Sequence, residues 1–161
     1  MKKVLVILLA LFISACGFRP MFTGNDMDIY VSPISGINGI DLRNELWSRF
    51  GGQRDSNATY TLSVNLNNPV TQYKALEQTG DATWQEISLT ASYTLLHNGK
   101  QIASGTERAA ESYTFVRYLV ASNASYNNAV QNTIRVLAEK ISARAIAETY
   151  NFSNSDTGTA K

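Results

Sequence analysis

The sequence predicts an α+β domain in which a four-stranded, mostly antiparallel or mixed sheet has two helices packed on one face. Residues 60–67 and 87–95 alternate apolar with polar side chains, as strands do when one face is buried and the other is wet. Residues 126–145 instead repeat apolar side chains at intervals of three and four, which is the period of a helix lying on a core. The expected order of elements is βαβββα.

The first half of the domain is expected to hold a strand, a helix and a second strand. Residues 28–31 favour β structure, and a Ser-Pro pair follows them. Residues 40–50 place leucine, leucine and phenylalanine four positions apart, and the glycines at 51–52 end this helix. The alternation over residues 60–67 makes the second strand the clearest pattern in the chain.

A tight hairpin is expected to join the third and fourth strands. The third strand covers residues 87–95, and the Asn-Gly pair at 98–99 supplies the positive φ angles that such a turn needs. The fourth strand covers residues 101–115 with weaker alternation, and Gly105 is a candidate β-bulge. The second helix is expected over residues 125–150.

The sequence is expected to divide into four segments. Residues 1–15 are expected to be a lipoprotein signal peptide, residues 16–25 a lipidated tether, and residues 26–150 a single domain. Residues 151–161 are small and polar, so we expect a disordered tail there. Within the domain, residues 67–86 are expected to form a loop whose arrangement the sequence leaves open.

The amino terminus has the parts of a bacterial export signal: two lysines, ten apolar residues over 4–13, and small residues before Cys16. At ~1.5 Å per residue the apolar run spans about half of a ~30 Å hydrocarbon core, so it does not form a lasting transmembrane helix. Residues 13–16 resemble a lipobox, in which the cysteine is lipidated and becomes the first residue of the mature protein. The alternative is an ordinary cleavage site that a cysteine happens to follow.

Cys16 is the only cysteine of the chain, so no disulfide partner competes for its thiol. Two or more acyl chains on it would hold the protein firmly on membrane lipid. Gly17, rather than an aspartate, follows the cysteine, and this resembles lipoproteins that are sorted to the outer membrane. We therefore expect a lipid-anchored protein of the cell outer membrane.

Composition excludes some classes of function. Without residues 1–15 the chain has 146 residues, a size that suits one hydrophobic core. It then carries 12 basic and 13 acidic residues, with no concentrated basic segment of the kind that binds nucleic acid. Only 17% of residues are charged, so the surface is expected to be largely neutral and polar.

No pattern in the sequence indicates an active site. His97 is the only histidine and lies beside the hairpin turn, an implausible place for a catalytic base. A lone histidine and a lipidated cysteine supply no metal site, and Asp26 and Asp28 are paired only in sequence. We therefore expect no catalytic residue, no metal and no cofactor.

Three aromatic residues stand apart from the predicted core positions. Tyr73, Trp84 and Tyr118 fall at the margins of predicted strands or helices and are candidates for contact with a partner, with ordinary half-buried packing as the alternative.

Residues 16–22, Cys-Gly-Phe-Arg-Pro-Met-Phe, resemble the start of mature lipopolysaccharide-assembly lipoproteins of the LptE family. Alphaproteobacterial members open with Cys-Gly-Phe-Arg-Pro-Leu-Tyr, so Met21 and Phe22 are conservative departures. The order of elements and the long alanine-rich helix are also similar, although only the opening string is specific. The resemblance implies two helices on a four-stranded sheet, as the residue patterns also predict.

The resemblance implies a partner, the outer-membrane β-barrel LptD. The lipoprotein would sit inside that barrel as a plug and assembly factor, and the complex would insert lipopolysaccharide into the outer leaflet. A neutral polar surface suits the polar interior of a barrel. Basic side chains would meet the lipopolysaccharide phosphates, and the candidates, each of which is otherwise a solvated surface charge, are Lys74, Lys100, Arg108 and Arg117.

Two other functions remain open from the sequence. One is an auxiliary or lipid-binding lipoprotein of another envelope transport system, such as an ABC-type exporter, and it predicts a sizeable apolar cavity between sheet and helices. The other is a cell-wall hydrolase, although no spacing of carboxylates singles out a catalytic pair.

Overall fold

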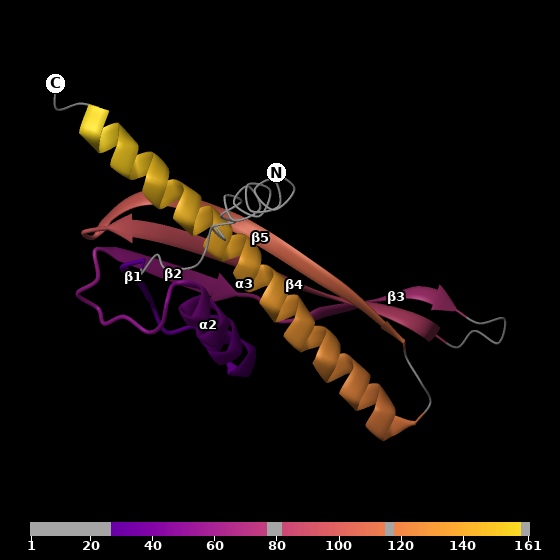
Figure 1. The fold of residues 1–161 in the computed structure, drawn as a ribbon. Coiled ribbons are helices and arrows are strands. Elements are labelled where there is room, and N and C mark those ends of the chain that lie inside the picture. The colour runs from indigo at the N-terminus through magenta and orange to yellow at the C-terminus, as the bar shows by residue number, and fades with distance from the viewer. Residues whose placement is uncertain (1–26, 77–81, 115–117, 159–161) are drawn as a thin grey trace, which may run out of the picture.

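The computed structural model describes residues 27–76, 82–114 and 118–158 (Figure 1). The signal peptide, Cys16, the tether and Arg117 lie outside these residues. The predicted α+β class is confirmed, with five strands and two helices among the described residues. In chain order the elements are β1 (Ile29–Val31), α2 (Ile37–Arg49), β2 (Tyr60–Leu66), β3 (Val70–Leu76), β4 (Ala82–His97), β5 (Lys100–Thr114) and α3 (Leu119–Gly158).

Strand β4 is the centre of the sheet. On one edge it pairs antiparallel with β5 along nearly its whole length. On its other edge β2 pairs with residues 91–97 and β3 with residues 82–88, so β2 and β3 lie end to end. The short strand β1 adds to β2 in parallel. The sheet is therefore four strands wide near the β4–β5 turn and three strands wide at the far end.

The sequence predicts four strands, whereas the structure has five among the described residues. The additional strand is β3, which lies within the segment 67–86 that was expected to be a loop. Residues 70–74 are exposed on both faces of this strand. A strand that buries neither face shows no alternation of apolar and polar residues, so the sequence carries little pattern from which to recognise it.

Both helices lie on one face of the sheet, where they cover the apolar side of β4 (Figure 1). Alternate residues of β4 are buried there, as the sequence predicts, and Leu62 of β2 is fully buried beside them. Helix α2 contributes Leu42 and Leu46 to the same core, and α3 contributes a buried stripe. The buried residues of β4 and α3 are Ile87, Leu89, Ala91, Tyr93, Leu95, Ala129, Val130, Ile134, Leu137, Ala138, Ile141 and Ala145.

Helix α2 ends where the sequence predicts. The Phe50 amide donates to the carbonyls of Leu46 and Trp47 at 3.1 and 3.2 Å, and the Gly52 amide donates to Trp47 at 2.7 Å. Gly51 and Gly52 both have positive φ, which glycine adopts without steric cost. The helix begins at Ile37, three residues before the expected start.

Helix α3 is longer than predicted at both ends. Its 40 residues run from Leu119 to Gly158, and at ~1.5 Å per residue they span ~60 Å. The expectation of a disordered tail from residue 151 was wrong for residues 151–158. The Phe152 ring lies 4.8 Å from His97, so the extension has a tertiary contact far away in sequence.

The β4–β5 hairpin confirms the Asn-Gly turn, because Asn98 and Gly99 have φ angles of 48° and 80°. The expected bulge at Gly105 was wrong, since the register shift of this ladder lies between Leu95 and Leu96. Gly105 instead pairs with Tyr93 and passes close to its ring. A Cβ atom at position 105 would lie 2.7 Å from the Tyr93 hydroxyl oxygen and 2.9 Å from its Cζ.

Replacing Gly105 with alanine is expected to lower the free energy of unfolding by about 1–2 kcal/mol, because displacement of the nearly buried Tyr93 ring outweighs the entropy gained by losing a glycine. Urea unfolding measures this change. Ser104→Ala, a neighbouring exposed position, is the control and should stay within about 0.5 kcal/mol of the parent. Equal stability of Gly105→Ala and the parent would contradict the close approach.

Asp28, just before β1, is hydrogen-bonded to Thr59, just before β2. Its Oδ2 accepts hydrogen bonds from the Thr59 hydroxyl at 2.6 Å and from the Thr59 amide at 2.7 Å. The Thr59 hydroxyl is the main cause that lowers the pKa of the Asp28 carboxyl below its ordinary value of 3.8, and the Thr59 amide adds to the effect.

The lowered pKa of Asp28 predicts a pH dependence of stability. The ionised carboxylate stabilises the fold above pH 3.8, and this contribution is lost as the pH falls through the lowered folded-state pKa. The carboxyl is exposed, so its whole effect is expected to stay below about 1 kcal/mol. Urea unfolding at pH 7 and pH 2 should show a smaller loss of stability for Asp28→Asn than for the parent. Thr59→Val should shrink the dependence in the same way.

Candidate interaction surface

Neither described helix covers the face of the sheet opposite the core, and its side chains range from exposed, as at Ser92 and Thr106, to buried, as at Ser88. Its side chains alternate with the buried ones along β2, β4 and β5, so the strand registers place them in rows across the sheet. Most are small, uncharged and able both to donate and to accept hydrogen bonds, although Leu96, Ala110 and Arg108 share the face. We call these residues the hydroxyl face: Thr61, Ser63, Asn65, Ser88, Thr90, Ser92, Thr94, Ser104, Thr106 and Ser112.

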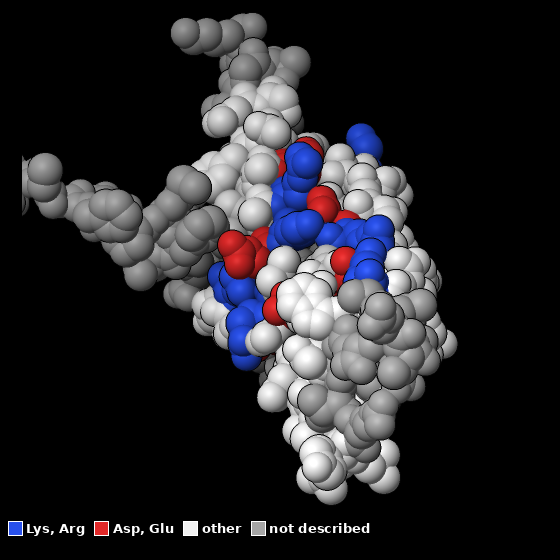
Figure 2. All heavy atoms as spheres, turned by 90° about the vertical axis from the view of Figure 1, so that its right-hand side faces the viewer, with Lys and Arg blue, Asp and Glu red and all other residues white. Residues whose placement is uncertain are grey.

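Three charged side chains border the hydroxyl face where the sheet is three strands wide. Glu86 Oε1 lies 3.1 Å from Lys74 Nζ and 3.9 Å from Arg108 Nη2. Two cations thus share one carboxylate, which leaves a net charge of +1 among the three. In the side view of Figure 2, basic side chains are interleaved with acidic ones.

The structure brings together two of the four basic residues predicted to meet lipopolysaccharide. Lys74 and Arg108 meet at Glu86, although they come from different strands. Lys100 lies in the β4–β5 turn opposite His97, which is eleven residues along β4 from Glu86, or ~35 Å. Arg117 is outside the described residues.

Two cations of α3, which the sequence did not mark, hold the helix against β5. Lys140 Nζ donates to the Arg108 carbonyl at 2.7 Å, and Arg144 Nε lies 3.5 Å from Glu107 Oε1. A strand that ends a sheet offers unpaired backbone groups to other chains. Lys140 occupies one of these groups on β5 and so makes this edge a poorer template for another strand.

The three aromatic candidates are exposed, but they do not form one site. Trp84 is 52% exposed and lies two residues from Glu86 on the same face of β4. Tyr73 is 71% exposed and pairs with the buried Gln85, so it faces the helix side. Tyr118 precedes α3, whose first residue, Leu119, is itself 75% exposed without any sign of this in the sequence.

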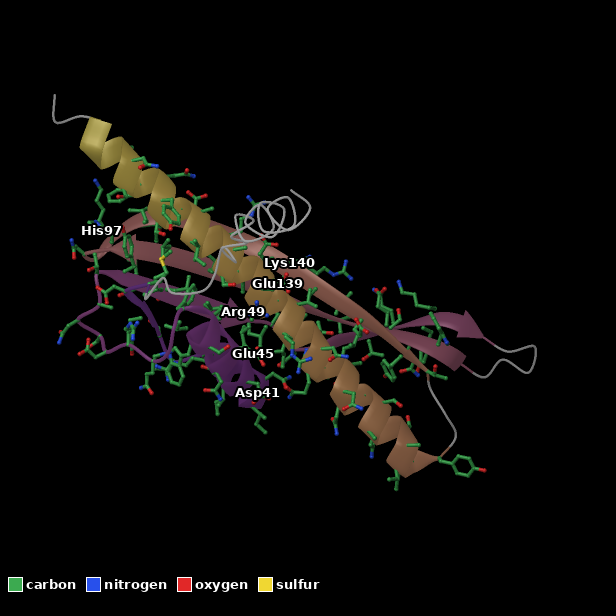
Figure 3. The ribbon with its side chains drawn as sticks, viewed as in Figure 1. Asp41, Glu45, Arg49, His97, Glu139 and Lys140 are labelled. Carbon is green, nitrogen blue, oxygen red and sulfur yellow. The ribbon has the colours of Figure 1, made fainter. Side chains whose placement is uncertain are left out.

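His97, the only histidine of the sequence, is the last residue of β4. The His97 ring contacts the rings of Tyr60 and Phe152, with centroids 5.0 and 4.8 Å away. Figure 3 shows His97 at one end of the sheet. The described residues contain no group of three or more histidine, cysteine or acidic side chains that could hold a metal ion. Nor do they include a helix that is both long and apolar enough to cross a membrane.

Solved structures share this fold. Rare lipoprotein B from Shewanella oneidensis superposes with a TM-score of 0.64 at 14% identity, over 78% of this chain and 98% of that one. A chain described as a lipoprotein from Caulobacter crescentus gives 0.62 at 20% identity, over 78% and 92%. A minor lipoprotein from Acinetobacter baumannii gives 0.55 at 18% identity, over 76% and 93%. The chain has the fold of these lipoproteins.

Comparison of the sequence with known proteins finds no relative beyond these structural similarities. No protein-family model matches the chain, and no curated protein matches it. At identities of 20% and below, the similarity to the solved structures establishes the fold and nothing finer.

Replacing Glu86 with glutamine is expected to strengthen binding to a polyanion, because Lys74 and Arg108 then lose the carboxylate they share. Retention on a heparin column at low salt should rise. The gain should vanish near 1 M salt, where the screening length is about 3 Å. Glu111→Gln changes the net charge equally at another site and is the control. An equal increase in retention for both variants would contradict a local cationic site.

Proposed function

We propose that this protein is a non-enzymatic outer-membrane lipoprotein that plugs the β-barrel LptD and assists lipopolysaccharide insertion into the outer leaflet. The hydroxyl face carries the proposal. A barrel interior is polar, and a plug must contact it over a broad area without leaving charges unpaired. Serine and threonine side chains meet this condition because each donates or accepts as its neighbour requires.

The other supports for this proposal are independent of the hydroxyl face. The fold is shared with solved lipoproteins, and the start of the chain resembles a lipoprotein signal that ends at Cys16. Lys74 and Arg108 offer paired cations of the kind that bind phosphate groups, at one border of the same face. In this proposal they meet the phosphates of lipopolysaccharide.

A lipid-binding subunit of another transport system is less well supported. It requires a sizeable apolar cavity between sheet and helices. The core there is filled by buried side chains of β4, α2 and α3. Two pockets lined by described residues, of about 370 and 260 Å³, lie beside helix surfaces and have serine, asparagine or charged residues in their walls.

The experiment is affinity purification of the lipidated full chain from detergent-solubilised outer membrane. We expect the barrel LptD as the dominant partner. Ser92→Arg places a long charged side chain in the middle of the hydroxyl face and should reduce the recovered barrel about tenfold, which corresponds to ~1.4 kcal/mol. Asn127→Arg, on an exposed position of α3, is the matched control and should recover the barrel normally.

Two results would overturn the proposal. One is a purification in which no barrel is enriched over a control lipoprotein. The other is depletion of the protein with no change in the amount of folded LptD or in outer-membrane permeability. Equal recovery with Ser92→Arg and the parent would remove the hydroxyl face from the interface.

A further inference from the structure

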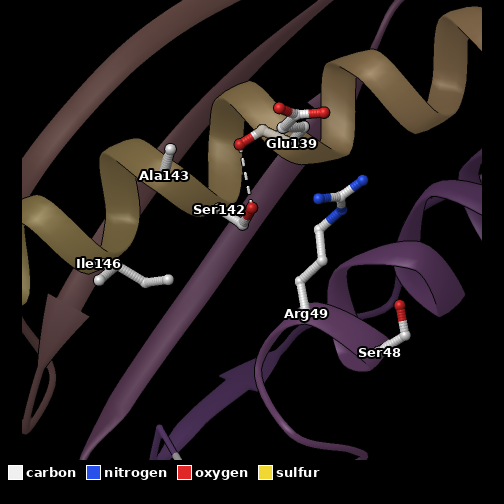
Figure 4. Close-up of a pocket in the computed structure, with 6 residues that line it drawn as sticks. All are labelled: Ser48, Arg49, Glu139, Ser142, Ala143 and Ile146. Atoms are coloured by element: carbon white, nitrogen blue, oxygen red, sulfur yellow. Dashed lines mark hydrogen bonds between the residues drawn. The ribbon is translucent and has the colours of Figure 1, made fainter. Parts of the chain in front are cut away.

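A groove of about 370 Å³ lies between the end of α2 and the middle of α3 (Figure 4). The two helices run in the same direction, since Asp41 bonds to Gln131 and Glu45 pairs with Arg135 one turn later on each helix. Helix α2 then stops at Arg49 while α3 continues. The groove opens at this point and is lined by Ser48, Arg49, Glu139, Ser142, Ala143 and Ile146.

The groove has polar groups without partners. Arg49 Nη2 donates to the Arg135 carbonyl at 3.3 Å, but Arg49 Nε is buried and has no acceptor among the described residues. The Glu139 carboxylate forms no ion pair in the described part of the chain. Figure 3 places Arg49 and Glu139 along the junction of the two helices. The groove therefore lacks a hydrogen-bond acceptor for the buried Arg49 Nε. The Glu139 side chain is exposed, so its carboxylate is accessible to a cation that enters the groove.

The remaining lining is small or apolar. Ser48 and Ser142 donate to carbonyls of their own helices, so neither needs an outside partner. Ala143 and Ile146 supply an apolar wall. An extended peptide suits this lining, because it brings backbone carbonyls for Arg49, an apolar side chain for Ile146 and, if basic, a cation for Glu139.

We propose that the groove binds the chain's own segment 17–26, which connects Cys16 to the domain. Flexible linkers are rich in glycine, serine and charged residues. This segment instead carries Phe18, Met21 and Phe22, which are costly to leave in water, and its single cation is Arg19. The segment thus supplies the apolar side chains and the positive charge that the groove lacks.

The place where the chain enters the domain agrees with this proposal. Met27, the first described residue, packs against the same core as Ile146. Two residues on, Ile29 pairs with Tyr60, which pairs with His97, and His97 contacts Phe152 near the end of α3. The chain therefore enters at the end of the sheet that Phe152 contacts, and Phe152 is six residues, or ~9 Å along α3, beyond Ile146 of the groove. Ten residues extend up to ~35 Å, which is enough to reach it.

Intramolecular binding needs little intrinsic affinity. A short tether holds its segment at an effective concentration of the order of 1 mM or more, so a segment with a Kd of about 1 mM would occupy the groove at least half of the time. The inference goes beyond the proposed function, because it requires residues 17–26 on the mature chain and not the barrel.

A cysteine pair tests the proposal in the lipidated full chain, where acylation occupies the Cys16 thiol. Phe22→Cys with Ala143→Cys should form an intramolecular disulfide at least about fivefold faster than Phe22→Cys with Arg144→Cys. Position 144 is the matched control, since Arg144 pairs with Glu107 and so lies on the side of α3 that faces β5. Mass spectrometry of the Cys16 peptide checks lipidation separately from docking.

Charge reversal keeps the test independent of the geometry of one disulfide. Glu139→Arg should lower the yield of the 22–143 disulfide to that of the control pair, and adding Arg19→Glu should restore it. Equal rates at positions 143 and 144, a yield that ignores both charge changes, or a disulfide that joins two chains would each overturn the proposal. Recovery of the barrel is measured separately, so failure of docking is distinguishable from failure of the proposed function.

Discussion

The structure depends on β4, a single strand of 16 residues that is paired on both edges. Strict alternation along it buries Ile87 through Leu95 under the helices and turns Ser88 through Thr94 to the other face. One strand therefore defines both the core and the candidate interaction surface. A shift of register by one residue would exchange the two faces and lose both.

Local patterns in the sequence predict the parts of the fold that local physics determines. The alternation of β2 and β4, the Asn-Gly turn at 98–99 and the glycines after α2 are of this kind. The rest depends on contacts between distant residues. Among the described strands β3 pairs with β4 alone, and the end of α3 contacts the sheet through Phe152, which packs on His97. Gly105 is explained by the ring of Tyr93 across the ladder, which no local pattern reveals.

The candidate site was predictable in its residue types and not in its arrangement. Lys74 and Arg108 are 34 positions apart, and only the pairing of β3 and β5 with opposite edges of β4 brings both to Glu86. Lys100 is closer to Arg108 in sequence, yet it lies at the other end of the sheet. The orphan Nε of Arg49 likewise arises from the end of one helix beside the continuation of another.

Because β2 and β3 lie end to end on one edge of β4, the two ends of the sheet are expected to differ in stiffness. Four adjacent strands beneath two helices resist bending, whereas a ribbon of three strands beneath one helix twists more and bends more easily. We therefore expect the wide end to be the stiffer part, and the narrow end, with Trp84 and the shared Glu86 carboxylate, to be the part that adjusts to a curved surface.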